Sequence, residues 1–171
     1  MLGAEVNTLT MRDFVFYQTE AVSRQGEQKR IATLYRLAKG MGEITVASVS
    51  GLIERTMPPE TLLSAALVIE NGGSCPPEEV EKALLRCGYQ PTEQVEGPGQ
   101  FARRGGILDF FSPGEREPVR IEFWGDDIDS MGYFDIATQR RSENVERCVI
   151  LPAAETLPEL SPGGMESLCR E

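Results

Sequence analysis

The sequence predicts an α+β fold: a small, mostly antiparallel β-sheet domain with one or two helices, flanked by an incomplete α/β segment. Between residues 97 and 134, short apolar runs alternate with glycine- and proline-rich turns, which is typical of antiparallel strands joined by hairpins. Residues 77–87 place apolar side chains at helical spacing and supply a helix for this sheet. The strand–helix–strand order of the first 59 residues is typical of an α/β domain.

The first section, residues 1–59, is predicted to form only part of an α/β domain. The aromatic run at 13–17 predicts a strand, and residues 24–39 predict an amphipathic helix that ends at a glycine. Residues 43–49 are rich in β-branched side chains and predict a buried parallel strand. A short helix is predicted over 50–55, stopped by the two prolines that follow it.

The second section, residues 60–151, is predicted to hold the β-rich domain. A strand at 66–70 and a helix at 77–87, which ends at Gly88, precede a rapid succession of strands. In the strand predicted at 119–123, apolar and charged residues alternate, so one of its faces is expected to be buried and the other exposed to solvent. The remaining predicted strands span residues 100–104, 107–111, 119–123, 128–134 and 145–151.

The third section, residues 152–171, is polar and rich in proline and glycine, and we expect it to be poorly ordered. No helix or strand is predicted to begin and end within this section. Because the first section is also incomplete, the sequence predicts a fragment of a longer polypeptide.

The composition is that of a globular protein with a marked acidic excess. Hydrophobic residues make up 40% and charged residues 26% of the 171 residues, and the formal net charge is −10. An acidic chain repels phosphate backbones, which argues against broad, non-specific nucleic-acid binding. No run approaches the roughly 20 apolar residues of a membrane helix, and residues 1–11 lack the pattern of a signal peptide. The sequence therefore predicts a cytoplasmic protein without membrane contact.

The sequence lacks the residues of the common catalytic and cofactor sites. It has no histidine, the commonest general base, and no glycine-rich phosphate loop. The cysteines show no CxxC spacing, so we expect reduced thiols in place of a zinc site. No catalytic, cofactor-binding or metal-binding residue is predicted, and no cofactor is expected for this chain. The four cysteines are Cys75, Cys87, Cys148 and Cys169.

Two acidic features allow alternative interpretations. Asp126, Asp127 and Asp129 could bind a divalent cation, but the glycine that precedes them favours a solvated hairpin turn. Asp109, in an otherwise apolar strand, could act as an acid with a raised pKa. Pairing with an arginine across the sheet is the favoured interpretation, because no second catalytic group lies near Asp109 in the sequence.

Two adjacent arginines give the most suggestive local feature. Arg103 and Arg104 occupy consecutive positions of a predicted strand, so they point to opposite faces. One is expected to form an ion pair within the domain and the other to stand exposed beside Phe101, Phe110 or Phe111. Arginine beside aromatic rings is the composition of a protein-interface hot spot. The alternative is that both arginines decorate a solvated face.

The longest motif is the run Gly97-Pro-Gly-Gln-Phe-Ala-Arg-Arg-Gly-Gly-Ile-Leu-Asp-Phe-Phe111, followed by Pro118-Val-Arg-Ile-Glu-Phe-Trp-Gly-Asp-Asp-Ile-Asp-Ser130. Shorter motifs lie at 12–16, 27–30, 46–49, 55–60, 134–135, 138–140 and 150–153. In this order they resemble the bacterial transcription-repair coupling factors, the Mfd family, in their UvrB-homology region. UvrB itself shares part of these motifs. The junction at 56–60 and the absence of a tyrosine-rich hairpin favour the coupling factors, while a UvrB fragment remains the alternative.

The resemblance implies a protein-docking role. In this family the β-rich domain binds UvrA and so recruits nucleotide-excision repair to stalled RNA polymerase, and the flanking segment is helicase-like but here lacks its nucleotide loop. Arg104 matches the arginine that precedes the glycine of the family motif, and Phe110 and Phe111 lie in the matching strand. Arg103 and Arg120 complete the predicted partner-binding set. A nucleic-acid-binding β domain that uses the three arginines is a further alternative.

The chain also departs from the family pattern. Ala102 stands where relatives tend to carry the first arginine of an Arg-x-Arg pair, and Gln90 and Pro91 stand where a basic residue is frequent, so a smaller contact set is expected. Full coupling factors resemble ATP-driven DNA translocases that bind RNA polymerase and DNA. Their ATP and Mg²⁺ sites are expected only in the whole protein, and we expect no enzymatic activity from this chain.

Overall fold

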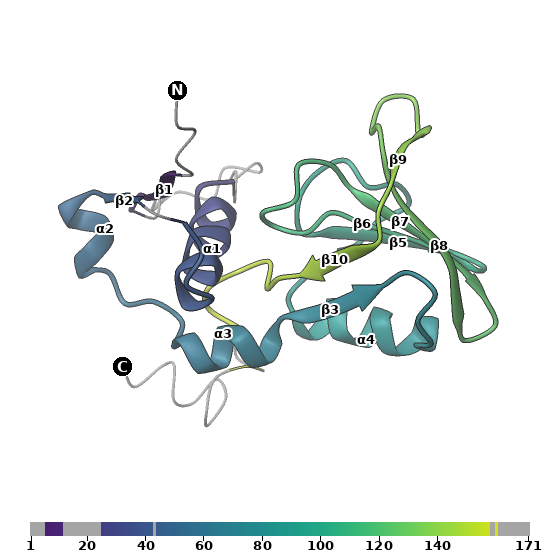
Figure 1. The fold of residues 1–171 in the computed structure, drawn as a ribbon, viewed down its shortest axis with the longest axis horizontal. Coiled ribbons are helices and arrows are strands. Elements are labelled where there is room, and N and C mark those ends of the chain that lie inside the picture. The colour runs from purple at the N-terminus through teal and green to yellow at the C-terminus, as the bar shows by residue number, and fades with distance from the viewer. Residues whose placement is uncertain (1–5, 12–24, 43, 158–159, 161–171) are drawn as a thin grey trace.

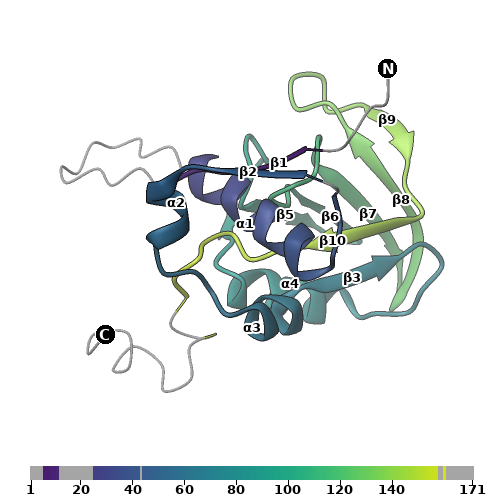
Figure 2. The same cartoon turned by 60° about the vertical axis from the view of Figure 1, so that its left-hand side comes forward.

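The computed structural model describes residues 6–11, 25–42, 44–157 and 160, and it confirms the predicted α+β fold (Figures 1 and 2). A six-stranded sheet forms the larger part, and the helices and two-stranded sheets lie against one face of it or to one side. In chain order the elements are β1 (Val6–Leu9), α1 (Gln25–Ala38), β2 (Ile44–Ala47), α2 (Val49–Ile53), α3 (Pro59–Ala65), β3 (Leu67–Glu70), α4 (Pro77–Arg86), β4 (Gln90–Pro91), β5 (Gln100–Arg104), β6 (Ile107–Phe110), β7 (Val119–Trp124), β8 (Asp127–Phe134), β9 (Arg141–Asn144) and β10 (Arg147–Ile150).

The six-stranded sheet has the order β4-β5-β6-β7-β8-β9, so neighbours in the sheet are also neighbours in the chain. All pairs are antiparallel except β4 and β5. Tight turns join β5 to β6 and β7 to β8, and each contains a glycine with positive φ, Gly105 at 61° and Gly125 at 64°. A side chain would be strained in this conformation, which explains the glycines at these turns.

One face of this sheet, the inner face, is buried beneath α4 and the antiparallel pair β3–β10 (Figure 1). Alternate strand residues point toward it, as the two-residue period of a strand requires. Helix α4 contributes Val80 and Leu84, which are fully buried. The sheet contributes Phe101, Leu108, Phe110, Val119, Ile121, Ile128 and Met131. We call the opposite side of the six-stranded sheet the outer face.

Helix α4 closely matches the predicted helix. Pro77 lies in its first turn, where the missing N–H is not needed for a helical hydrogen bond. Gly88 follows the helix with φ of 80°, and a Cβ at this position would lie 2.6 Å from Leu157 Cδ2. Glycine is therefore needed both for the positive φ of this turn and to leave room for the side chain of Leu157.

Helix α1, also predicted, connects the front of the chain to the β-rich part. It contributes to a second core of four buried residues, Ile31, Met57, Leu62 and Leu151. Beside this core, the fully buried side chain of Arg30 places Nε 2.7 Å from Glu155 Oε1. Arg30 Nη1 also donates hydrogen bonds to the carbonyl oxygens of Thr10 and Gly51. A buried guanidinium needs such partners, so these contacts bring distant segments together.

Strand β2 corrects one prediction for the front section. It runs parallel to β1, as expected of residues 43–49, but it is not buried: Ile44 and Val46 are 49% and 56% exposed. Among the described residues β2 pairs with β1 alone, and neither residue joins an apolar cluster. The strand predicted at 13–17 lies outside the described residues.

Other differences concern short elements and the C-terminal section. The short helix predicted over 50–55 is present as α2, which ends before the two prolines, and Pro59 also begins α3, because the first helical turn tolerates proline. Strands β4 and β9 were missed because they are short and wholly exposed, so they carry no apolar pattern. Residues 152–171 were expected to be poorly ordered, yet Pro152, Ala153 and Glu155 are buried; residues 158–159 and 161–171 lie outside the described residues.

The described cysteines carry free thiols. Cys87 and Cys148 are buried and Cys75 is half-buried, while Cys169 lies outside the described residues. Burial raises the pKa of Cys87 to about 11 and that of Cys148 to about 12. None of the helices in the described ranges has the length and apolar character needed to cross a membrane.

Candidate functional site

The outer face of the six-stranded sheet has a covered end and an open end. At the covered end, Val95 from the β4–β5 loop packs with Ala102 and Phe134, and Phe111 lies against them. The open end lies toward the two glycine turns and carries charged side chains. The polar and charged positions of the outer face include Arg104, Asp109, Arg120, Glu122 and Ser130.

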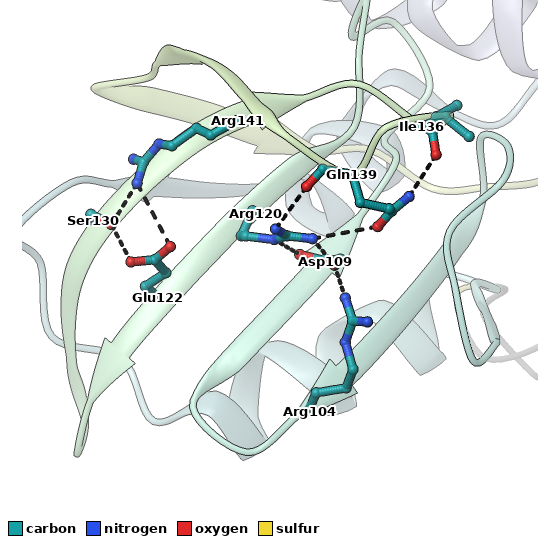
Figure 3. A network of polar contacts seen from close by, with 8 residues as sticks. All are labelled: Arg104, Asp109, Arg120, Glu122, Ser130, Ile136, Gln139 and Arg141. Atoms are coloured by element: carbon teal, nitrogen blue, oxygen red, sulfur yellow. Dashed lines mark hydrogen bonds and ion pairs between the residues drawn. The ribbon is translucent and has the colours of Figure 1, made fainter.

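Asp109 is the centre of a three-residue network on the outer face (Figure 3). Its side chain is almost fully buried, with 2% exposed. Arg104 Nη2 donates to Asp109 Oδ2 at 2.8 Å, and Arg120 donates through Nε to Oδ1 at 2.7 Å and through Nη2 to Oδ2 at 2.8 Å. The prediction that Asp109 pairs with an arginine across the sheet is confirmed, since Asp109 and Arg120 are register partners.

Arg120 supports this network and has little surface of its own. Its side chain is 16% exposed, and its guanidinium lies 4.7 Å from the ring centre of Phe134. Nη1 donates to the backbone oxygen of Gln139 at 3.2 Å. Hydrogen bonding to the Asp109 carboxylate raises the pKa of Arg120 above its ordinary value. Both sides of the guanidinium are engaged, so Arg120 holds Asp109 in place.

Arg104 is the exposed member of the network. It ends β5 beside the Gly105 turn, and 52% of its side chain is exposed. Only Nη2 is bonded to a described residue, Asp109. A guanidinium has five N–H donors in a planar fork, so most of them face solvent. The two arginines outnumber the one carboxylate, and the network keeps a net positive charge.

Arg103, the other arginine of the pair, lies on the inner side of the sheet. Its Nη1 donates to Glu81 Oε2 at 2.9 Å and its Nη2 to Glu78, both on α4. Hydrogen bonds to these carboxylates raise the pKa of Arg103, and the same contact lowers the pKa of Glu78. The structure thus places the guanidinium groups of Arg103 and Arg104 on opposite sides of the sheet.

The aromatic candidates also separate between the two faces. Phe110 is fully buried in the inner core with Phe101, which corrects its inclusion in the predicted partner-binding set. Phe111 is half-buried and lies at the covered end of the outer face. A strand that is buried on both sides, as β6 is at Leu108 to Phe110, gives no alternation from which to choose between the two rings.

A second polar cluster on the outer face was missed by the sequence analysis. Arg141 Nη1 donates to Ser130 Oγ at 2.9 Å and lies 3.8 Å from Glu122 Oε1, and Ser130 Oγ donates to Glu122 Oε2 at 3.1 Å (Figure 3). Arg141 belongs to β9, whose four residues are all exposed. The alternation of charged and apolar residues in β7 was the only sequence signal for this cluster, and it indicated Glu122 alone.

The three aspartates near the β7–β8 turn are all exposed. Asp126 lies in the turn after Gly125, and Asp127 begins β8 opposite Trp124. Within the described ranges, no group of three or more histidine, cysteine or acidic side chains is placed to hold a metal ion.

Comparison with known proteins finds relatives among bacterial repair factors. The chain is 36% identical to the transcription-repair-coupling factor of Escherichia coli (strain K12) over 126 residues, which is 74% of this chain and 11% of that protein. Identity to the transcription-repair-coupling factor of Haemophilus influenzae is 32% over 139 residues, 81% of this chain and 12% of the relative. For the Bacillus subtilis factor it is 30% over 161 residues, 92% of this chain and 14% of the relative.

The chain therefore spans between 11% and 14% of the length of these curated relatives. The family model described as the UvrB interaction domain matches residues 67–155, which is more than half of the chain. That match runs from β3 to the segment after β10 and contains the whole six-stranded sheet with its outer face. On this match the chain belongs to the UvrB interaction domain family.

Proposed function

We propose that this chain is the UvrA-docking module of a transcription-coupled nucleotide-excision-repair factor, and that Arg104 is its principal anchor. The observation that carries the proposal is a half-exposed guanidinium on the open end of the outer face, oriented by the buried carboxylate of Asp109. Membership of the UvrB interaction domain family and the names of the relatives support the repair context. The family domain is a binding module, and we assign no catalytic step to it.

The local charge supports an acidic partner surface. The whole chain has a formal net charge of −10. On the outer face, the two described clusters combine three arginines with two carboxylates, an excess of one positive charge (Figure 3). This local excess favours an acidic group of the partner opposite Arg104, while the exposed carboxylates near the β7–β8 turn lie at the other edge of the open end.

The mode of support also favours tight docking. The Arg104 guanidinium is bonded to a carboxylate that Arg120 holds from the other side, so its position is restricted before any partner arrives. Binding then removes less conformational freedom from the Arg104 side chain, which lowers the entropic cost of association. An arginine whose carboxylate partner is already buried can add a second acidic group from another protein through its remaining donors.

The wider activity belongs to the longer protein of which such modules are part. We propose that the parent couples repair to stalled RNA polymerase in the bacterial cytoplasm, acting on DNA with ATP and Mg²⁺ supplied through other regions. For the described part of this chain we propose no cofactor and no metal ion. UvrA is the proposed direct partner of the outer face.

The test is a titration of purified UvrA by isothermal calorimetry with matched variants. Arg104→Ala is expected to weaken binding at least tenfold, because truncating a charged interface anchor costs about 2–5 kcal/mol. Arg103→Ala is the control, since it removes a neighbouring arginine from the inner side and should leave the affinity unchanged. Equal affinity of wild type and Arg104→Ala would overturn the assignment of the anchor.

A further inference from the structure

We propose that Trp124 is the apolar anchor of the same docking face and that the partner offers it an apolar pocket with acidic groups on one side and basic groups on the other. This inference rests on the proposed function, because it assigns chemistry to the surface that receives the outer face. The inference adds a second anchor residue, and it predicts where acidic and basic groups lie on the partner, which the Arg104 contact alone does not.

Trp124 is an unusually exposed aromatic residue. It is 82% exposed, and it is the only tryptophan of the chain. It follows Glu122 by two residues at the end of β7, where buried and less buried residues alternate, so it occupies an outer-face position. Tryptophan and arginine are the residue types most enriched among interface hot spots, and here both lie on one sheet face.

The strand register places Trp124 near Arg104. Arg104 lies opposite Ile107, and Ile107 lies opposite Glu122, so the three form a row across β5, β6 and β7. Trp124 lies two residues beyond Glu122 along β7 and therefore on the same face. From strand spacing and rise, its Cα lies on the order of 10 Å from that of Arg104. This separation falls within the footprint of one ordinary protein interface.

The platform beneath Trp124 is fixed from both sides. The β5–β6 turn is bonded to β7 through Phe123 N, which donates to the backbone oxygen of Gly106 at 2.7 Å. On the other side, Cys75 N donates to the backbone oxygen of Asp126 at 2.8 Å, and Ile128 N donates to that of Gly73 at 2.8 Å. An exposed indole on a braced hairpin keeps its position, so little backbone ordering is needed on binding.

Opposite charges flank Trp124 along the sheet. Arg104 lies two strands away on β5, and on the other side Asp127 is the register partner of Trp124 in β8. Asp126 and Asp129 add further exposed carboxylates at this end. These carboxylates repel a phosphate backbone, so stacking of the indole on nucleic-acid bases is disfavoured. A protein pocket with an acidic rim toward Arg104 and a basic rim toward Asp127 matches the pattern.

The test uses the single tryptophan as a probe. The chain is labelled with 5-fluorotryptophan, and its fluorine-19 spectrum is recorded during titration with UvrA. The expected result is a shifted or broadened resonance at saturation, together with at least a tenfold loss of affinity for Trp124→Ala and a smaller loss for Trp124→Phe. Leu85→Ala is the control, because Leu85 is 47% exposed on α4, away from the outer face.

The proposed basic rim of the partner pocket is tested by Asp127→Lys, which is expected to weaken UvrA binding several-fold. Unchanged or tighter binding would overturn the proposal of a basic rim. Thermal melts check that each variant folds, which an exposed position should allow. If Arg104→Ala loses affinity while Trp124→Ala binds like wild type with an unmoved fluorine signal, the role of Trp124 is overturned and the docking function stands. If wild type does not bind UvrA, both proposals fail.

Discussion

Arg103 and Arg104 are consecutive residues of β5 whose guanidinium groups lie on opposite sides of the six-stranded sheet. Arg103 Nη1 is 2.9 Å from Glu81 on α4, and Arg104 Nη2 is 2.8 Å from Asp109 on the outer face. The first arginine fastens a helix to the sheet, and the second stands half-exposed. One pair of residues therefore provides both a structural contact and the proposed docking anchor, and each serves as a control for the other.

Loss of the Asp109 carboxylate should destabilise the fold more than loss of Arg104. Asp109→Asn leaves the mostly buried Arg120 guanidinium without its ionic partner, and breaking a buried pair from one side costs roughly 3–5 kcal/mol. Urea denaturation measures the change in the free energy of unfolding. Arg104→Ala should lie within about 1 kcal/mol of wild type, because its side chain is half-exposed. Similar midpoints for Asp109→Asn and wild type would contradict the supporting role of Asp109.

The buried ion pair of Arg30 with Glu155 should contribute strongly to the contact between α1 and the segment after β10. The side chains of Arg30 and Glu155 are 0% and 1% exposed, so Glu155→Gln is expected to cost roughly 3–5 kcal/mol of stability. Chemical denaturation measures the loss. Glu70→Gln is the matched control, because the pair of Glu70 with Arg147 is mostly exposed and should contribute little. Equal stability of the two variants would show that Glu155 is dispensable.

Two glycines with nearly the same backbone conformation should respond differently to alanine. Gly88 has φ of 80° and Gly72 has φ of 72°, so both substitutions strain the backbone by about 1 kcal/mol. Only Gly88→Ala also meets a neighbour, Leu157 Cδ2 at 2.6 Å, whereas nothing lies within 4 Å of a Cβ at Gly72. Gly88→Ala should therefore have the lower melting temperature. The prediction is refuted by equal melting temperatures.

Alkaline pH should destabilise the protein through its buried thiols. Burial raises the folded-state pKa of Cys87 to about 11 and that of Cys148 to about 12, above the ordinary value of 9.0. The folded state then binds more protons than the unfolded state above pH 9, so the free energy of unfolding falls as pH rises from about 9 to 11. The fall is measured by denaturation at each pH.

The control for this experiment is the double variant Cys87→Ala, Cys148→Ala. Other groups also titrate at high pH, so the informative quantity is the difference in slope between the double variant and wild type. The variant should be less stable at neutral pH, because two packed side chains are shortened, and should lose less stability per pH unit between 9 and 11. Parallel slopes would mean that the thiols do not titrate with the predicted pKa values.

The sequence by itself determined the fold class and most of the β-rich domain. Turn glycines, a helix between Pro77 and Gly88, and alternation along β7 are local signals, and the elements follow them closely. The same two-residue period correctly placed Arg103 and Arg104 on opposite faces. Local signals failed for β2, predicted as buried, and for β4 and β9, whose residues are exposed and carry no apolar pattern.

Only the tertiary structure decided which face of the sheet is covered. Alternation states that two faces differ, but α4 and the β3–β10 pair, far from β6 in the sequence, bury Phe110 and leave the open end exposed. The pairing of Arg104 with Asp109, the exposure of Trp124 and the contact of Arg30 with Glu155 have the same origin. Each depends on packing between distant segments, which local propensity and spacing do not encode.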